Sequence, residues 1–195
     1  MTIKNRLNGS KPKHPVVVIG AGPAGLSCAI SLMEMDIPVL LLDQNEPGGT
    51  ILQYPRRKLV MVQPIEMPGY GQMNNTEYSK EELLEIWDQI IASKKPNFQS
   101  GHQLRAIELE NDTYMVETSL DRIPAEFIVL ALGRRGTPRK LNIEGEELSK
   151  VAYQLIDTEG YQNKHILVVG GGDSAVEAAV GLGQQTGNTV TLSYR

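Results

Sequence analysis

The sequence has 195 residues, with 41% hydrophobic and 22% charged side chains, enough for one large domain or two small ones. Nineteen basic against 23 acidic residues give a net charge of −4, which argues against nucleic-acid binding as the main function. The single cysteine, Cys28, excludes an internal disulfide, a paired-cysteine redox centre and a cysteine-built metal cluster, and it favours a reducing compartment. The polar first 15 residues lack a signal-peptide core, and no apolar run of about 18 residues occurs, so we expect a cytoplasmic protein without a membrane span.

The chain opens with the pattern of a strand, a turn, a helix and a second strand. Residues 1–14 are expected to be a flexible N-terminus. The β-branched run 15–19 predicts a strand buried on both faces, and residues 23–35 predict a helix with a proline in its first turn. Residues 39–42 predict a second buried strand, which ends at Asp43.

The middle of the chain contains a stretch rich in proline and glycine and then an amphipathic helix. Residues 44–75 are rich in proline and glycine and are expected to be irregular. Ser79 and Glu82 form a capping-box pattern before an amphipathic helix. The apolar face of that helix is Leu83, Ile86, Trp87 and Ile90.

Short strands follow that helix. The runs 103–109, 113–118 and 123 onward predict an antiparallel meander, with a hairpin turn at 110–112. Residues 127–131 predict one more buried strand.

The first glycine turn fits G-x-G-x-x-G, with Gly20, Gly22 and Gly25 at the glycine positions. In a dinucleotide site the first glycine permits the tight turn, the second lets a pyrophosphate approach, and the third lets helix pack on strand. Asp43 lies 23 residues after Gly20, where an acid accepts a ribose hydroxyl. The alternative is a set of packing glycines beside a solvated aspartate.

The second glycine turn, at 170–175, fits G-x-G-x-x-A between predicted strands at 165–169 and 189–194. The second of these strands has no acid at its end. Arg195 there favours a 2′-phosphate and hence NADP over NAD, unless it is only a frayed terminal side chain.

Together these motifs resemble flavoproteins of the thioredoxin-reductase type, within the two-dinucleotide flavin reductases. The resemblance covers residues 14–195 and includes the Gly48-Gly49-Thr50 turn and the strand ending Ala131-Leu132-Gly133. It implies an α/β protein: a Rossmann-like FAD-binding domain with an inserted antiparallel meander, followed by a truncated second Rossmann-like unit for NAD(P). The implied organisation is an FAD-binding domain at 15–140, a connection at 141–164 and the start of an NAD(P)-binding domain at 165–195.

The resemblance also implies the cofactor-binding residues. FAD would contact Gly20, Ala21, Gly22, Pro23, Ala24, Gly25, Asp43, Gln44, Gly49, Thr50, Leu104, Ala131 and Gly133. NADP, or alternatively NAD, would contact Gly170, Gly172, Asp173, Ser174, Ala175 and Arg195.

Thioredoxin reductases carry a redox cysteine pair before the second glycine turn. Here the two positions hold Tyr153 and Ile156, although the aspartate after them is kept as Asp157. Because neither side chain can form a thiolate, thiol relay to thioredoxin is excluded. What remains is hydride transfer from nicotinamide to flavin and electron delivery to a ferredoxin-like or other non-thiol acceptor. No catalytic residue and no metal site are predicted.

Two alternatives stay open: reduction of a small disulfide by flavin alone, and an inactive nucleotide-binding subunit. The rest of the nicotinamide sheet and a return segment to the FAD domain are missing from the pattern. Apolar surface is therefore expected to be exposed, which predicts instability or association with a second copy or another covering partner.

Four features have a further interpretation. The basic segment 54–58 is either a solvated loop or a contact for a partner or a phosphate. Cys28 and Trp87 are expected in the core, and the histidines show no metal spacing.

Overall fold

The computed structural model describes residues 3–7, 9–56, 58–133 and 140–194. The chain divides into two compact units. Unit 1 comprises residues 1–53 and 59–136, and unit 2 comprises residues 54–58 and 137–195. The sequence placed the start of the connection at 141 and did not assign residues 54–58 to the second unit.

Unit 1 is built on a parallel four-stranded sheet in the order β11-β1-β2-β7. Its strands are β1 (Val16–Ile19), β2 (Val39–Leu42), β7 (Phe98–Gln99) and β11 (Phe127–Leu130). β1 pairs with both β2 and β11 in parallel register, Val16 opposite Val39 and Phe127. All residues of β1 and β2 are buried, as their continuous apolar runs predict.

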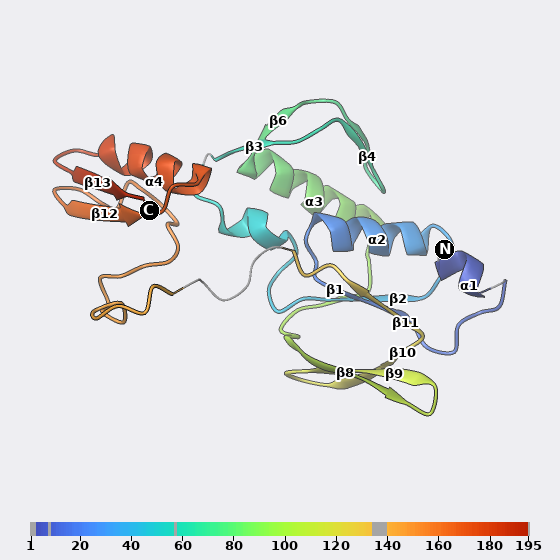
Figure 1. The fold of residues 1–195 in the computed structure, drawn as a ribbon. Coiled ribbons are helices and arrows are strands. Elements are labelled where there is room, and N and C mark those ends of the chain that lie inside the picture. The colour runs from blue at the N-terminus through green and yellow to red at the C-terminus, as the bar shows by residue number, and fades with distance from the viewer. Residues whose placement is uncertain (1–2, 8, 57, 134–139, 195) are drawn as a thin grey trace. The chain divides into compact units, whose positions relative to one another are not determined.

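Two layers enclose this sheet, one on each face. Figure 1 shows the helices α2 (Pro23–Met33) and α3 (Lys80–Lys94) on one face, and the three-stranded meander on the other. The meander consists of β8 (Leu104–Glu110), β9 (Thr113–Thr118) and β10 (Arg122–Ala125). Between meander and sheet lies a buried cluster that includes Val17, Ile19, Leu40, Leu42, Val116 and Ala125.

The local signals for this unit are largely confirmed. Ser79 caps α3 and exchanges hydrogen bonds with Glu82, the predicted capping box, and the predicted apolar face of α3 is buried. Asn111 and Asp112 both have positive φ at the hairpin between β8 and β9, which is the geometry of a type I′ turn.

Two expectations were wrong. β11 is only half-buried and Leu130 is 55% exposed, because β11 is an edge strand of the sheet rather than a central one. Residues 44–75 are not wholly irregular. They contain the 3-10 helix η1 (Gly49–Gln53) and the strands β3 (Leu59–Met61), β4 (Ile65–Met67) and β5 (Gly71–Met73).

These short strands form two-stranded ribbons. β3 pairs with β6 (Glu77–Ser79), and β4 pairs with β5. Near the N-terminus, residues 3–7 form the short helix α1 (Ile3–Leu7), and Leu7 is buried.

Unit 2 contains a single strand–turn–helix–strand motif. β12 (His165–Val169) pairs in parallel with β13 (Thr189–Ser193), and α4 (Asp173–Gly183) connects them. In the described part of this unit Leu182 is the one buried hydrophobic side chain. Leu167 and Val169 of β12 are more than half exposed, as are Ile156 and Val180. The predicted exposure of apolar surface is therefore present.

Candidate nucleotide-binding turns

The first glycine turn lies at the carboxyl end of β1, beside the end of β2. The amide of Gly20 donates to the carbonyl of Leu42 over 2.7 Å, so the turn begins directly against the last residue of β2. Gly20 has φ +107, and a Cβ there would collide with the backbone carbonyl of Ala131. A Cβ on Gly25 would collide with the carbonyl oxygen of Gly20. Both glycines are therefore required by the backbone itself.

Asp43 is tied to this turn. One carboxylate oxygen accepts a hydrogen bond from the amide of Ala21 at 2.6 Å, and the other accepts from the amide of Asn45 at 2.9 Å. The predicted ribose acceptor is thus held in place by backbone donors at the mouth of the turn. Each carboxylate oxygen can accept a second hydrogen bond, so Asp43 can still take a hydroxyl group.

The Gly48-Gly49 turn also meets this site. The amide of Gly48 donates to the carbonyl of Ala21 at 3.0 Å. Gly49 has φ +56, and a Cβ on it would lie 2.8 Å from the Cα of Gly22. Gly48 was not among the predicted site residues, although it supplies the hydrogen bond that joins the two turns. Its signal was its place beside Gly49 in a double glycine.

The segment after β11 borders the first glycine turn on the β11 side of the sheet. The amide of Ala131 donates to the carbonyl of Ile19 at 2.8 Å, which continues the pairing of β11 and β1 by one residue. Gly133 follows with φ +66 and open space where a side chain would be. The structure thus brings together four of the predicted segments: the first turn, Asp43, Gly49 and Ala131–Gly133.

The beginning of α2 supplies backbone donors to this site. Gly22 is its N-cap, without a side-chain cap, and Pro23 opens the helix. The amides of Gly22 and Ala24 have no hydrogen-bond partner among the described residues. Unpaired amides at a helix N-terminus favour a phosphate group.

The remaining predicted FAD residues differ in surroundings. Gln44 is exposed and Thr50 is half-buried in η1. The side chain of Leu104 packs against the buried cluster between the meander and the sheet, so it is part of the hydrophobic core. A backbone contact of Leu104 with a cofactor stays a prediction.

The second glycine turn repeats the backbone arrangement of the first. The amide of Gly170 donates to the carbonyl of Ser193 at 2.9 Å, as Gly20 donates to Leu42. Gly172 is the N-cap of α4, and a Cβ on it would meet nothing within 4 Å. Asp173 and Ser174 are exposed in the first turn of α4. Arg195, which the sequence assigned to a 2′-phosphate, lies outside the described residues.

The two turns differ at the last position of the motif. Gly25 leaves no room for a Cβ, whereas Ala175 carries one that lies 3.2 Å from where a Cβ on Gly170 would be. The second turn is therefore slightly more open, as the sequence predicts for alanine in place of glycine.

The basic segment 54–58 is not simply solvated. The Nζ of Lys58 lies 2.6 Å from Oε2 of Glu177 and 4.8 Å from the ring centre of Tyr54, and its side chain is 17% exposed. Both partners belong to unit 2, and Glu177 lies in α4. At least this lysine has an internal partner within its own unit. Arg57 lies outside the described residues.

Tyr153 and Ile156 stand where thioredoxin reductases carry their redox cysteines, and Tyr153 takes part in a hydrogen-bonded cluster. The hydroxyl of Tyr153 donates to Oε1 of Glu146 at 2.6 Å, and the carboxylate of Glu146 also accepts from the amides of Leu141 and Asn142. These bonds lower the pKa of Glu146 and raise that of Tyr153. Ile156 is 69% exposed.

Cys28 lies in α2, half-buried, and desolvation by burial raises its pKa. A raised pKa leaves the thiol protonated and poorly nucleophilic, which agrees with a packing role. Trp87 is 5% exposed, as expected of a core residue, although its Nε1 has no hydrogen-bond partner among the described residues.

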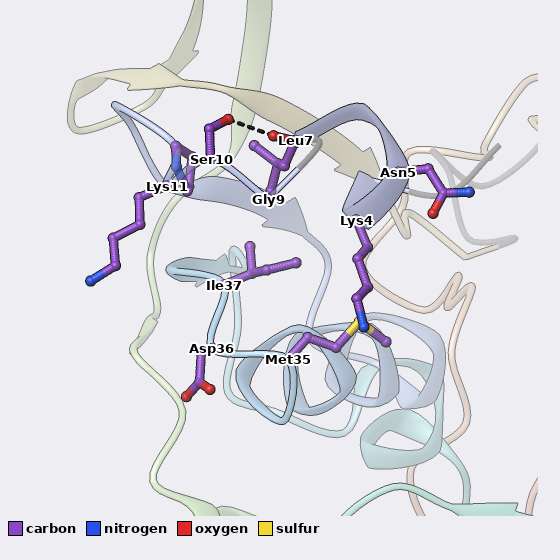
Figure 2. Close-up of a pocket in the computed structure, with 10 residues that line it drawn as sticks. Lys4, Asn5, Leu7, Gly9, Ser10, Lys11, Met35, Asp36 and Ile37 are labelled. Atoms are coloured by element: carbon purple, nitrogen blue, oxygen red, sulfur yellow. Dashed lines mark hydrogen bonds between the residues drawn. The ribbon is translucent and has the colours of Figure 1, made fainter.

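A pocket of about 580 Å³ lies at the other end of the sheet. Residues 9–12 before β1 and residues 35–37 before β2 line it, together with Lys4, Asn5 and Leu7 of the N-terminal segment. Figure 2 shows Met35 and Ile37 in its wall and the hydrogen bond from Ser10 to the carbonyl of Leu7. Because the strands are parallel, this amino-terminal end lies opposite the glycine turn, so the pocket is not part of the nucleotide site.

The described residues hold no group of three or more His, Cys, Asp or Glu side chains that could bind a metal ion. None of their helices is both long and apolar enough to cross a bilayer.

Each unit thus has a strand that ends in a glycine turn, which is the pattern of a dinucleotide-binding fold. The family model described as pyridine nucleotide-disulphide oxidoreductase matches residues 17–195, and the chain belongs to this family. The resemblance to thioredoxin-reductase-like enzymes and the α/β fold class are thereby confirmed.

Two relatives illustrate the range of the family. Bacilliredoxin reductase Bdr of Bacillus subtilis is 27% identical, and the match covers 94% of this chain and 57% of that protein. A ferredoxin–NADP reductase of Beijerinckia indica is 31% identical, covering 92% of this chain and 52% of that protein. This chain therefore spans about half the length of these relatives.

Two solved structures are similar to this chain over most of its length. The bacillithiol disulfide reductase Bdr of Bacillus cereus is 26% identical with a TM-score of 0.83, over 93% of this chain and 58% of that one. The thioredoxin reductase of Lactococcus lactis is 30% identical with a TM-score of 0.70, over 94% of this chain and 56% of that one.

Proposed function

We propose that the chain carries the nucleotide-binding part of an FAD-dependent oxidoreductase that uses NADPH, with NADH as the alternative donor. The observation that carries this proposal is the repeated turn. In each turn, the first glycine donates its amide to the last residue of the neighbouring strand. The first turn has a positioned acid, Asp43, suited to FAD, and the second has none.

When bound, the flavin would accept a hydride from the nicotinamide and pass the electrons to an acceptor. The chain's own groups would bind and orient the two dinucleotides. The free amides at Gly22 and Ala24 would hold the FAD pyrophosphate, and Asp43 a ribose hydroxyl. The predicted NADP residues at the start of α4 would hold the second pyrophosphate.

For the acceptor we propose a ferredoxin-type protein, because the chain lacks a redox cysteine pair and ferredoxin–NADP reductases are among its relatives. A small disulfide is the second candidate. It is favoured by the similarity to bacilliredoxin reductase and to bacillithiol disulfide reductases. The reducing compartment inferred from the single cysteine leads us to propose the cytoplasm as the location.

The test is an anaerobic titration of the FAD-loaded 195-residue chain with NADPH and then with NADH. We expect loss of the oxidised flavin absorbance near stoichiometric NADPH, and reoxidation by ferredoxin but not by a low-molecular-weight disulfide. A chain that takes up no FAD would refute the proposal. FAD uptake without bleaching would identify an inactive nucleotide-binding subunit, and reoxidation by the disulfide alone would select the second candidate.

A further inference from the structure

His102 and Thr118 are the two buried polar or charged side chains in the described part of the chain, at 5% and 6% exposure. They bond to each other, because Nδ1 of His102 lies 3.1 Å from Oγ1 of Thr118. Burial of a polar group lowers stability unless the group is hydrogen-bonded. This pair is bonded, and neither side chain has a part in the function proposed above.

The other hydrogen bonds of Thr118 fix the direction of this contact. Its hydroxyl donates to the carbonyl of Asp121 at 3.0 Å, and it accepts from the amides of Leu120 and Asp121. A hydroxyl group has a single proton to donate. Nδ1 of His102 is therefore the donor to Thr118. Loss of the imidazole would leave the three bonds within residues 118–121 in place.

The backbone of His102 reaches Asp43. The amide of His102 donates to the carbonyl of Asp43 at 2.9 Å, and the amide of Asp43 donates to the carbonyl of Gln99 at 3.2 Å. The carboxylate of Asp43 accepts instead from Ala21 of the first glycine turn and from Asn45. The end of β7 and the segment after it thus hold the backbone of Asp43, while the glycine turn meets its carboxylate.

The segment 100–103 between β7 and β8 contains no helix or strand, and the end of β9 holds it in place. Oγ of Ser119 donates to the carbonyl of Gly101 at 2.9 Å and accepts from the amide of Gln103 at 3.1 Å. Within this segment, His102 is the residue that bonds both to the meander and to Asp43. Its ring bonds to Thr118 and its amide to Asp43.

We propose that His102 is a positioning residue of the first nucleotide site. Its imidazole is anchored on Thr118, so that its amide holds Asp43 where the carboxylate can accept a ribose hydroxyl of FAD. This inference rests on the proposed function. It gives the buried pair, and with it the meander, a part in FAD binding that acts through Asp43.

Two substitutions separate the hydrogen bond of His102 from its volume. His102→Leu keeps a buried side chain of similar size but removes the donor. His102→Asn keeps an N–H on the atom next to Cγ, where Nδ1 lies in histidine. The leucine variant should therefore lose the anchor on Thr118, and the asparagine variant should retain it.

The first measurement needs no cofactor. Amide hydrogen exchange of the full chain, followed residue by residue by NMR, reports the bond from Ala21 to the carboxylate of Asp43. We expect the amide of Ala21 to exchange about fivefold faster in His102→Leu, the effect of about one net hydrogen bond, and within about twofold of the wild type in His102→Asn. The amide of Ala131, which donates to Ile19 in the same sheet, is the internal control and should not change.

The second measurement is the affinity for FAD in a double-mutant cycle, by isothermal titration calorimetry. His102→Leu should weaken FAD binding about fivefold, and His102→Asn should stay within about twofold of the wild type. In the Asp43→Ala background, His102→Leu should change the affinity by less than about twofold, because the carboxylate through which it acts is gone.

The outcomes distinguish the two proposals. Unchanged exchange at Ala21 in His102→Leu, or an equal rise at Ala131, would overturn the positioning role. So would a loss of FAD affinity that persists in full in the Asp43→Ala background, and in each of these cases the proposed function stands. A wild-type chain that takes up no FAD would overturn the proposed function and the role of His102 in FAD binding together.

Discussion

At the first turn, the absence of side chains at Gly20 and Gly25 allows strand, helix and the segment after β11 to meet. The atoms that a Cβ would strike are backbone carbonyl oxygens, which cannot move aside as the end of a flexible side chain could. Sequence motifs identify these glycines correctly, but they do not show which contact makes each one necessary. Only the structure distinguishes Gly25, which faces Gly20, from Gly22, which faces Gly49.

We expect Gly25→Ala to lower the free energy of unfolding of unit 1 by about 3 kcal/mol, the upper end of the range for overpacking, because a backbone atom blocks the methyl group. Urea denaturation followed by the fluorescence of Trp87, which lies in unit 1, measures this loss. The control is Gly22→Ala in the same turn, whose added Cβ would lie 3.7 Å from the Cα of Gly49, an ordinary contact distance. Equal stability of wild type and Gly25→Ala would contradict the packing argument.

At the scale of elements, local signals predicted α3 and the hairpin well because short-range contacts decide them. The capping box of Ser79 and Glu82 and the positive φ values at Asn111 and Asp112 follow from neighbours in the sequence. The burial of β11 does not follow in this way. Its apolar run is typical of a central strand. In the sheet, however, β11 pairs with β1 on one side and forms the edge on the other. The ribbons formed by β3 to β6 were missed because three-residue strands leave too short a pattern.

The capping box predicts a pH dependence. Hydrogen bonds from the backbone and side chain of Ser79 lower the pKa of Glu82 in the folded state. A lowered folded pKa means that the stabilisation is complete above the unfolded pKa and is lost as the pH falls through the folded one. Thermal unfolding between pH 7 and pH 3 should therefore show a smaller acid destabilisation in Glu82→Gln than in the wild type.

Glu146 has a pKa lowered in the same direction, so the acid destabilisation will be reduced in Glu82→Gln and not abolished. Glu85→Gln, on the same helix but outside the capping box, serves as the control and should follow the wild type. Parallel pH profiles for wild type and Glu82→Gln would show that the cap does not contribute.

At the scale of the whole molecule, the two units have very different cores. Unit 1 buries β1, β2, the inner face of α3 and the cluster beneath the meander. Unit 2 buries Leu182 within its described part and exposes apolar residues on both β12 and α4. Since buried apolar area is the main source of folding free energy, the two units should differ in stability.

Hydrogen exchange measured by mass spectrometry should show this difference. We expect the amides of β1 and α2 to exchange at least about tenfold more slowly than those of β12 and α4. Added FAD should slow exchange further around the first glycine turn and leave β12 unchanged. Equal protection of the two units without ligand would mean that the exposed face of unit 2 is covered in solution, and the oligomeric state measured by light scattering would then identify a second copy.

The sequence by itself determined the α/β class, both glycine turns, Asp43 at the first and the missing redox cysteines, because each of these is a short-range pattern or a matter of side-chain chemistry. It could not show that Gly48-Gly49 closes onto Gly22, that Lys58 pairs with Glu177, or that β11 is an edge. These depend on contacts between residues far apart in the chain.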